Sequence, residues 1–198
     1  MVYIIDACFH WIGFHLTQHL LTEGHEVIGI DPLEGTKQEN LYFFIGRNSR
    51  FQHFHSIEEM ERHCHNETIE AVISVGRPAN GKSRFGELFV CESVEGFMKN
   101  EGTSVELPPL YGEWMPRDEQ AINISKSEPL LFSELVDRED SIYIEDFIVY
   151  FFKNFWEKGT RVSASDLRSL QLSPTKNKEE LKEQLQEHYR QYRRIYED

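Results

Sequence analysis

The beginning of the chain constrains the fold more than any other part. A run of β-branched and aromatic residues at 2–5 is typical of a buried strand, and apolar positions from Ile12 then recur at helical spacing until Gly24. A second apolar run at 26–31 predicts another strand. Strand, helix and strand within about 30 residues predict a βαβ unit with parallel strands and a right-handed crossover.

The alternation continues less regularly after this unit. Ser56 and Glu59 have the spacing of a capping box, which predicts a helix at 57–64. The other predicted elements are a strand at 41–45, a buried strand at 71–75, a helix at 85–99 with Phe85, Leu88, Phe89, Val94 and Met98 inward, and a strand at 105–107. The predicted fold is therefore α/β and Rossmann-like, a mainly parallel sheet flanked by helices, with a reduced α-rich C-terminal part.

The final third of the chain has a different pattern. It predicts a helix from Ile144, a short helix at 163–170 and, after a linker at 173–176, a capped amphipathic helix at 177–198. The last helix carries an apolar stripe, which fits either docking onto its own domain or contact with another chain. The stripe consists of Leu181, Leu185, Tyr189, Tyr192 and Tyr196. The expected organisation is a core at 1–112, a second segment at 113–172 and this helix at 177–198.

The composition is that of a folded protein, with 39% hydrophobic and 13% aromatic residues. The formal net charge of −13 argues against a general nucleic-acid binder, because such proteins neutralise phosphates with Lys and Arg. Three scattered cysteines argue against a disulfide framework and for a reducing compartment. We find no signal or membrane segment, so the expected location is cytoplasmic with no membrane partner.

The turn after the first predicted strand bears on ligand binding. A dinucleotide site needs glycines there for a tight turn, for approach to the pyrophosphate and for helix packing. The segment resembles the extended short-chain dehydrogenase/reductase family of nucleotide-sugar epimerases and dehydratases, whose fingerprint is Gly-x-x-Gly-x-x-Gly. Its three positions fall on Ala7, His10 and Gly13. Only the packing glycine is kept, while Asp31 stands where the resemblance places the carboxylate that binds the adenosine ribose.

The resemblance extends downstream, with departures at the catalytic positions. The family's Tyr-x-x-x-Lys pair falls on Asn80 and Arg84, and no Tyr-x-x-x-Lys occurs anywhere in the chain. Segments 105–112, 141–147 and 162–167 resemble later family motifs. The chain is short for this family. Only residues 76–79 separate the strand ending at Val75 from Asn80, so the resemblance implies that a helix, and a strand that carries a catalytic Ser or Thr, are deleted there. Asparagine cannot exchange a proton near neutral pH and arginine stays charged, so catalysis by these residues is not expected.

Three other groups of residues have both a structural and a functional interpretation. A histidine-rich segment holds five potential metal ligands, although surface histidines fit it better and no metal site is predicted. The residues are His53, His55, His63, Cys64 and His65. The pair His15 and His19 fits a helix surface, and Cys8 fits either a buried residue or a thiol activated at a helix N-terminus.

The sequence thus favours a non-catalytic, epimerase/dehydratase-like binding or regulatory module. Its partner would be a protein, a second copy of the chain or a small anionic ligand, and no cofactor is expected. One alternative is a divergent NAD(P)-dependent enzyme acting on a nucleotide sugar, with NAD preferred because Asp31 would repel a 2′-phosphate. Another is a dimeric scaffold that uses the C-terminal helix.

Overall fold

The computed structural model describes residues 1–64, 68–76, 87–122, 130–156 and 176–197. The chain forms two compact units, Met1–Glu106 and Leu107–Asp198. The sequence predicts a first boundary after residue 112 and a separate C-terminal helix. In the structure the boundary follows Glu106, and this helix belongs to the second unit. The short helix predicted at 163–170 and most of the linker at 173–176 lie outside the described residues.

The first unit is built on one six-stranded sheet. Its strands are β1 (Val2–Asp6), β2 (Glu26–Ile30), β3 (Phe51–Phe54), β4 (Ile69–Val75), β5 (Glu87–Cys91) and β6 (Thr103–Glu106), in the spatial order β3-β2-β1-β4-β5-β6. The first four pair in parallel, and β5 is antiparallel to both β4 and β6. The predicted α/β class with a mainly parallel sheet is confirmed, and the strand order is compatible with a Rossmann-like fold.

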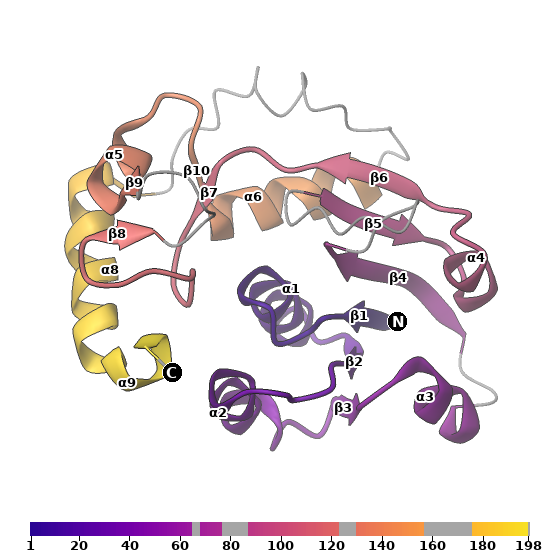
Figure 1. Cartoon of the computed structure of the whole chain (residues 1–198). Coiled ribbons are helices and arrows are strands. Elements are labelled where there is room, and N and C mark those ends of the chain that lie inside the picture. The colour runs from indigo at the N-terminus through magenta and orange to yellow at the C-terminus, as the bar shows by residue number, and fades with distance from the viewer. Residues whose placement is uncertain (65–67, 77–86, 123–129, 157–175, 198) are drawn as a thin grey trace. The chain divides into compact units, whose positions relative to one another are not determined.

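Helices cover both faces of this sheet (Figure 1). On one face lie α1 (Trp11–Thr22) and α2 (Thr36–Ile45), and on the other lie α3 (Ile57–His63) and α4 (Val94–Met98). The second face has a core in which Met60 of α3 and Phe97 of α4 pack with strand residues such as Ile4. The predicted βαβ unit is confirmed, because β1 and β2 are parallel and α1 connects them.

The prediction of a helix at 85–99 is wrong for residues 87–91. Residues 87–91 form strand β5, and only 94–98 are helical. Leu88, Phe89 and Val90 are consecutive and all buried, which suits a strand covered on both faces and not one stripe of a helix. Ser93 then begins α4 by accepting a hydrogen bond from the backbone N–H of Gly96. Met98, predicted to face inward, is 44% exposed.

The strand predicted at 41–45 is also wrong, since these residues end helix α2. Leu41 and Ile45 are the buried residues of this helix and lie four positions apart, on one helical face. The predicted N-cap is confirmed, since Ser56 Oγ accepts from the N–H of Glu59. The return bond differs from that of a capping box, because the Glu59 carboxylate accepts from the N–H of His55, one residue before the N-cap. Strand β3 was not predicted as an element.

The second unit has small sheets and several helices. Its elements are β7 (Leu110–Tyr111) parallel to β10 (Ile142–Tyr143), β8 (Ala121–Ile122) antiparallel to β9 (Leu130–Leu131), α5 (Phe132–Asp137), α6 (Ile144–Phe151), a π-helical turn at Phe152–Trp156, α8 (Lys178–Gln191) and α9 (Arg193–Glu197). The predicted helix start at Ile144 is confirmed. The C-terminal helix is interrupted at Tyr192, between α8 and α9.

The apolar stripe of the C-terminal helix packs inside this unit. Leu181, Leu185 and Tyr189 are each at most 1% exposed. The side chain of Arg117 donates to the Leu185 carbonyl oxygen at 2.6 Å, and the N–H of Trp114 donates to the Tyr196 hydroxyl at 2.7 Å. Of the two interpretations of the stripe, docking within its own unit is therefore the one that the structure supports.

This packing predicts a large loss of stability on truncation of Leu185. Leu185→Ala leaves a cavity in a site that is 0% exposed and should lower the free energy of unfolding by about 3 kcal/mol, measured by urea denaturation. The matched change Leu131→Ala, at a side chain 43% exposed, should cost less than about 1 kcal/mol. Equal losses in the two variants would contradict the packing described.

Candidate functional site

The candidate site lies at the carboxyl ends of the parallel strands in the first unit. Strand order reverses between β1 and β4, because the chain runs outward from β1 through β2 to β3 and then returns to β4 on the other side. In open α/β sheets, ligands bind outside the carboxyl ends of the strands at such a switch point. The turn from β1 into α1, at residues 7–10, borders this point.

The backbone of this turn has the shape that favours glycine, although two of its three fingerprint positions have other residues. Ala7 has a φ of 58°, in the left-handed region. A Cβ at Gly13 would overlap the carbonyl oxygen of Ala7, so the helix can approach the turn only because this residue is glycine. The packing role predicted for Gly13 is confirmed.

His10 occupies the start of helix α1. As the N-cap residue, it accepts a hydrogen bond at Nδ1 from the N–H of Ile12, with a length of 3.4 Å. Burial, together with the nearby cation of Lys37, lowers the pKa of His10 to about 4. At neutral pH the ring is therefore uncharged, and one of its nitrogens faces the helix amides that would otherwise face an anion.

Asp31 is a buried bridge between β2 and the turn. Its Oδ2 accepts from the N–H of Phe9 at 3.1 Å, and its Oδ1 accepts from the N–H of Leu33 at 3.2 Å. The residue is only 6% exposed, and burial raises its pKa. Both carboxylate oxygens are thus engaged with backbone amides of the same chain. We call the Asp31 carboxylate and these two amides the Asp31 clasp.

A second polar pair spans the switch point itself. The hydroxyl of Ser74, at the end of β4, donates to Oδ2 of Asp6 at 2.7 Å. Ser74 is 0% exposed, and Asp6 ends the neighbouring strand β1. The sequence analysis missed this pair, because the two residues are 68 positions apart. The sequence does hold one indication of it: each residue lies at the carboxyl end of a predicted buried strand, and the carboxyl ends of neighbouring parallel strands lie side by side.

Cys8 is a buried structural residue and not an activated thiol. It is 0% exposed, and burial, with further contributions from Asp31 and Asp6, raises its pKa well above the ordinary value. A raised pKa removes the thiolate that nucleophilic chemistry needs. The structure therefore supports the buried interpretation of Cys8 over the activated thiol.

The histidine-rich segment does not form a metal site among the residues that the structure describes. His53 and His55 bond to the backbone carbonyl oxygens of Asp31 and Pro32, and His63 bonds to that of Glu59. The expectation of a helix surface is wrong for His15, which is 7% exposed and packs against the rings of Trp11 and Phe14. His65 lies outside the described residues.

The two residues aligned with the family's catalytic pair, Asn80 and Arg84, also lie outside the described residues. Shortly after these positions the structure describes β5, an antiparallel strand, where the resemblance expects the same helix to continue.

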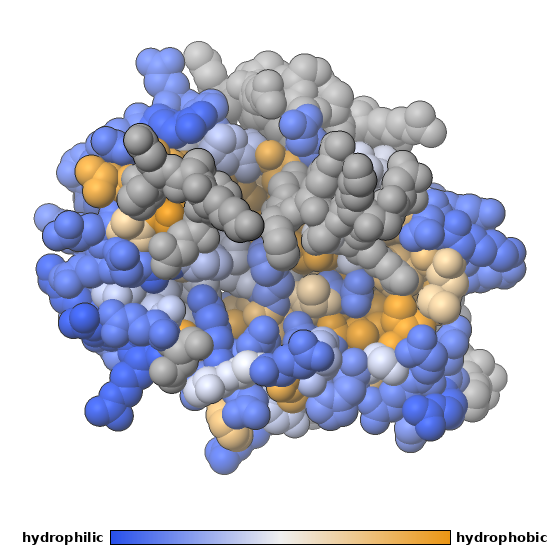
Figure 2. Space-filling model, in the orientation of Figure 1, coloured by the Kyte–Doolittle hydropathy of each residue, from blue (hydrophilic) through white to orange (hydrophobic). Residues whose placement is uncertain are grey.

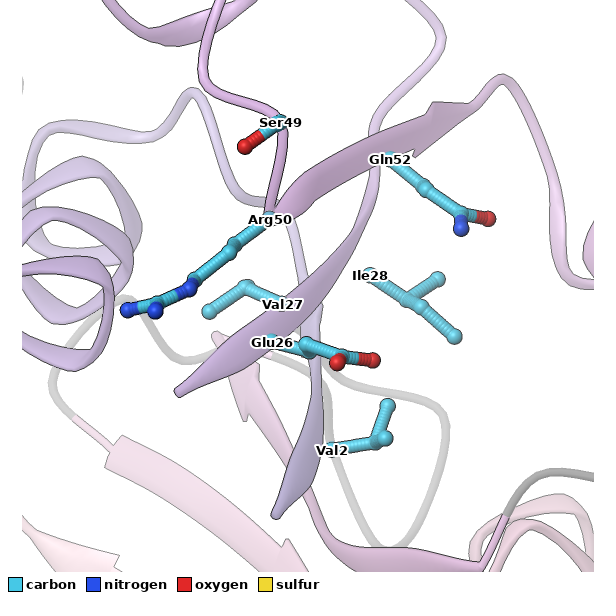
Figure 3. Close-up of a pocket in the computed structure, with 7 residues that line it drawn as sticks. All are labelled: Val2, Glu26, Val27, Ile28, Ser49, Arg50 and Gln52. Carbon is cyan, nitrogen blue, oxygen red and sulfur yellow. The ribbon is translucent and has the colours of Figure 1, made fainter. Parts of the chain in front are cut away.

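A small pocket lies at the other end of the same strands, where their amino ends are (Figure 3). It is formed where β1, β2 and β3 begin, and it is lined by Val2, Glu26, Val27, Ile28, Ser49, Arg50 and Gln52. Figure 3 shows Glu26 and Gln52 on one side of β2 and Arg50 on the other, so their polar groups do not converge. Met1, next to Val2 of the lining, is 64% exposed. Figure 2 shows hydrophobic residues among hydrophilic ones on the face of the molecule that it displays. The pocket therefore lacks the arrangement of a polar ligand site.

The second unit contains its own buried polar groups. The Tyr143 hydroxyl donates to the Glu113 carboxylate at 3.0 Å, and Gln184 donates to the same carboxylate. Arg117 is 2% exposed and lies over the ring of Phe132, with 4.0 Å between the guanidinium carbon and the ring centroid. These groups join the C-terminal helix to the rest of the unit, which assigns them a structural role.

The chain matches no family model, no curated protein and no solved structure. The family resemblance accordingly stays a prediction based on motifs. None of the helices in the described parts of the chain has the length and apolar character needed to cross a membrane.

The conformation of Ala7 gives a prediction about stability. Ala7→Gly removes the backbone strain of a non-glycine residue in the left-handed region. It should raise the free energy of unfolding by about 0.5–1 kcal/mol, measured by urea denaturation. The control Ala71→Gly, in the middle of strand β4 and 0% exposed, should lower it by a similar amount. A loss of stability in Ala7→Gly would show that the turn does not have this conformation.

The environment of His10 gives a prediction about pH. Its pKa is lower in the folded chain, about 4, than in the unfolded chain, so its stabilising effect is complete above the ordinary histidine pKa and is lost as the pH falls toward 4. His10→Asn keeps an acceptor at the helix start but does not titrate. Between pH 7 and pH 5 the original chain should lose about 2 kcal/mol more stability than this variant. The control His63→Asn, at the exposed end of α3, should follow the original profile.

Proposed function

We propose that this chain is a non-catalytic, epimerase/dehydratase-like protein with a Rossmann-like core, which acts as a binding or regulatory module. One observation carries the proposal: the groups that would bind the pyrophosphate of a dinucleotide are engaged within the chain. His10 caps the start of α1, and the N–H of Phe9 is bonded to Asp31.

The charges at this edge of the sheet support the same conclusion. A pyrophosphate is doubly anionic and is favoured by helix amides and by cations. Here the His10 ring is neutral near pH 7, and the carboxylate of Asp6 ends strand β1 next to the turn. The whole chain carries a formal charge of −13. Asp31 cannot bind a ribose without giving up a hydrogen bond to a backbone amide.

The absence of the catalytic pair from the sequence supports a non-catalytic role. The family's mechanism needs a phenol whose pKa is lowered by a lysine four residues later, and no tyrosine in this chain has such a lysine. The antiparallel strand β5 follows closely after the aligned positions 80 and 84, where the resemblance calls for a continuous helix. A different local fold argues against the family's catalytic arrangement at this place.

The partner of such a module would be a protein, a second copy of the chain or a small ligand. Dimerisation through the C-terminal stripe is the weaker route, because Leu181, Leu185 and Tyr189 are already buried within their own unit. A scaffold that used this stripe would first have to undock the helix. We therefore favour a partner that binds elsewhere on the folded chain.

Calorimetric titration of the full chain with NAD and NADP tests the proposal. We expect no binding heat with either cofactor, under conditions in which an NAD-dependent dehydrogenase gives a clear isotherm. A parallel assay with nucleotide sugars and NAD should show no turnover.

Two outcomes would contradict this proposal. Binding of NAD in preference to NADP would favour the divergent enzyme, in which Asp31 contacts the ribose. Turnover that is abolished by Asn80→Ala or Arg84→Ala, but kept in the exposed control Lys99→Ala, would show that the aligned residues are catalytic.

A further inference from the structure

The outer face of helix α2 carries two adjacent exposed phenylalanines. Phe43 is 74% exposed and Phe44 is 48% exposed. In the described parts of the chain, the other large hydrophobic residues that are exposed stand singly, which is ordinary on a protein surface. The inner face of the same helix buries Leu41 and Ile45. A helix with apolar residues on both faces is normally covered on both, so a partner is expected on the outer face of α2.

The two rings have different surroundings. Phe44 packs toward helix α1, with 6.5 Å between the centroids of its ring and that of Phe14. Together with Leu21 of α1, it lines a groove of about 250 Å³ between the two helices. The ring of Phe43 lies beside that of its neighbour Tyr42, at 6.2 Å between centroids, and is otherwise the more exposed of the pair. An apolar side chain of a partner can therefore cover Phe43 and reach the groove beside Phe44.

Opposite charges flank Phe43 on the same face of the helix. Glu39 and Arg47 are exposed and lie four residues before and four residues after Phe43, and residues four apart share one face of a helix. The backbone is still helical at Gly46, the residue before Arg47. Neither charged group has an ion pair among the described residues. They lie about 12 Å apart along the helix axis, too far to pair within one chain.

A two-fold axis at Phe43 matches these charges. In a two-fold contact between antiparallel helices, a residue before the axis meets the residue equally far after it in the other copy, and the reverse contact forms as well. Glu39 of each copy then lies beside Arg47 of the other. Parallel packing of the two helices would instead bring Glu39 beside Glu39 and Arg47 beside Arg47. The charge pattern therefore favours an antiparallel pair of α2 helices.

We propose that the outer face of α2 is a self-association surface, on which a second copy of this chain docks antiparallel about Phe43, with Glu39 of each copy beside Arg47 of the other. An anionic membrane fits this face less well, because the chain carries a net charge of −13 and such membranes bind polybasic segments. The proposal goes beyond the function proposed above and does not rest on it, since an active enzyme could dimerise in the same way.

The size of the face sets the expected affinity. A ten-residue helix is about 15 Å long, so its contact is smaller than the roughly 1,600 Å² of a standard interface. The negative net charge of each copy also opposes association, although salt at about 0.15 M screens charges beyond about 8 Å. We therefore expect a weak dimer, with a dissociation constant on the order of 10–100 μM.

Sedimentation equilibrium of the full chain tests the proposal. Between about 5 and about 500 μM, the mean mass should rise from that of one chain toward that of two. Phe43→Ala should raise the dissociation constant at least about tenfold, because it removes the apolar centre of the contact from both copies. The matched change Met98→Ala removes an exposed apolar side chain from α4, on the other face of the sheet, and should leave the dissociation constant unchanged.

An exchange of charges tests the antiparallel register. Glu39→Lys and Arg47→Glu each place two pairs of like charges in the homodimer, so each variant alone should have a dissociation constant raised about tenfold. An equimolar mixture of the two variants brings two pairs of opposite charges together, and its association should be within about threefold of that of the original chain. The control Glu61→Lys, at an exposed position of α3, should dimerise like the original chain.

The results that overturn the proposal are distinct from a failure to fold. All the changed positions are exposed, so the circular dichroism of each variant should equal that of the original chain. A chain that remains monomeric at about 500 μM overturns the proposal. If it instead binds vesicles of phosphatidylserine and phosphatidylcholine, and Phe43→Ala abolishes that binding, the face serves a lipid surface. A dimer unaffected by Phe43→Ala, or a mixture of charge variants no tighter than each variant alone, overturns it as well. Binding of NAD would contradict the proposed function and leave this result unchanged.

Discussion

The arrangement of the first unit depends on one buried carboxylate. Asp31 follows β2 and binds the N–H of Phe9, in the turn that joins β1 to α1. The N–H of Asp31 donates to the carbonyl oxygen of Phe54, at the end of β3. One residue thus links the carboxyl ends of two strands to the start of the first helix. A buried carboxylate is costly unless its oxygens are hydrogen-bonded, and both oxygens of Asp31 are.

This link is also the basis of the proposal that the carboxyl ends of the strands do not hold a dinucleotide. The tight turn is kept, with Ala7 in a left-handed conformation and Gly13 in close contact with it, so the fold of a phosphate turn remains. The groups that would bind phosphate have other partners: His10 caps the helix and Asp31 binds backbone. Of the three positions at which the resemblance expects glycine, Gly13 is kept, whereas Ala7 and His10 replace glycine.

Much of the fold could be predicted from the sequence, and the errors have physical causes. The βαβ unit and the capping box at Ser56 gave clear local signals. The run at 87–91 was misread because consecutive apolar residues fit either a buried strand or a helix, and pairing with β4 decides between them. In the site, the packing role of Gly13 was expected from the family resemblance, and the structure shows the close contact with Ala7. Burial of Cys8 was one of the two interpretations of its position, and the structure supports it. The Asp6 and Ser74 pair depends on which strands are neighbours, and the burial of Asp31 depends on packing, so local sequence could not reveal them.

We infer that the turn at residues 7–10 is closed by side chains of the same chain, those of His10 and Asp31. Crystals of the full chain soaked with NAD test it most directly. We predict no cofactor density at the start of α1, with Nδ1 of His10 still at the Ile12 amide and the Asp31 carboxylate still bonded to Phe9. Density for a pyrophosphate at the N-terminus of α1, with His10 displaced and Asp31 turned toward a ribose, would contradict the account.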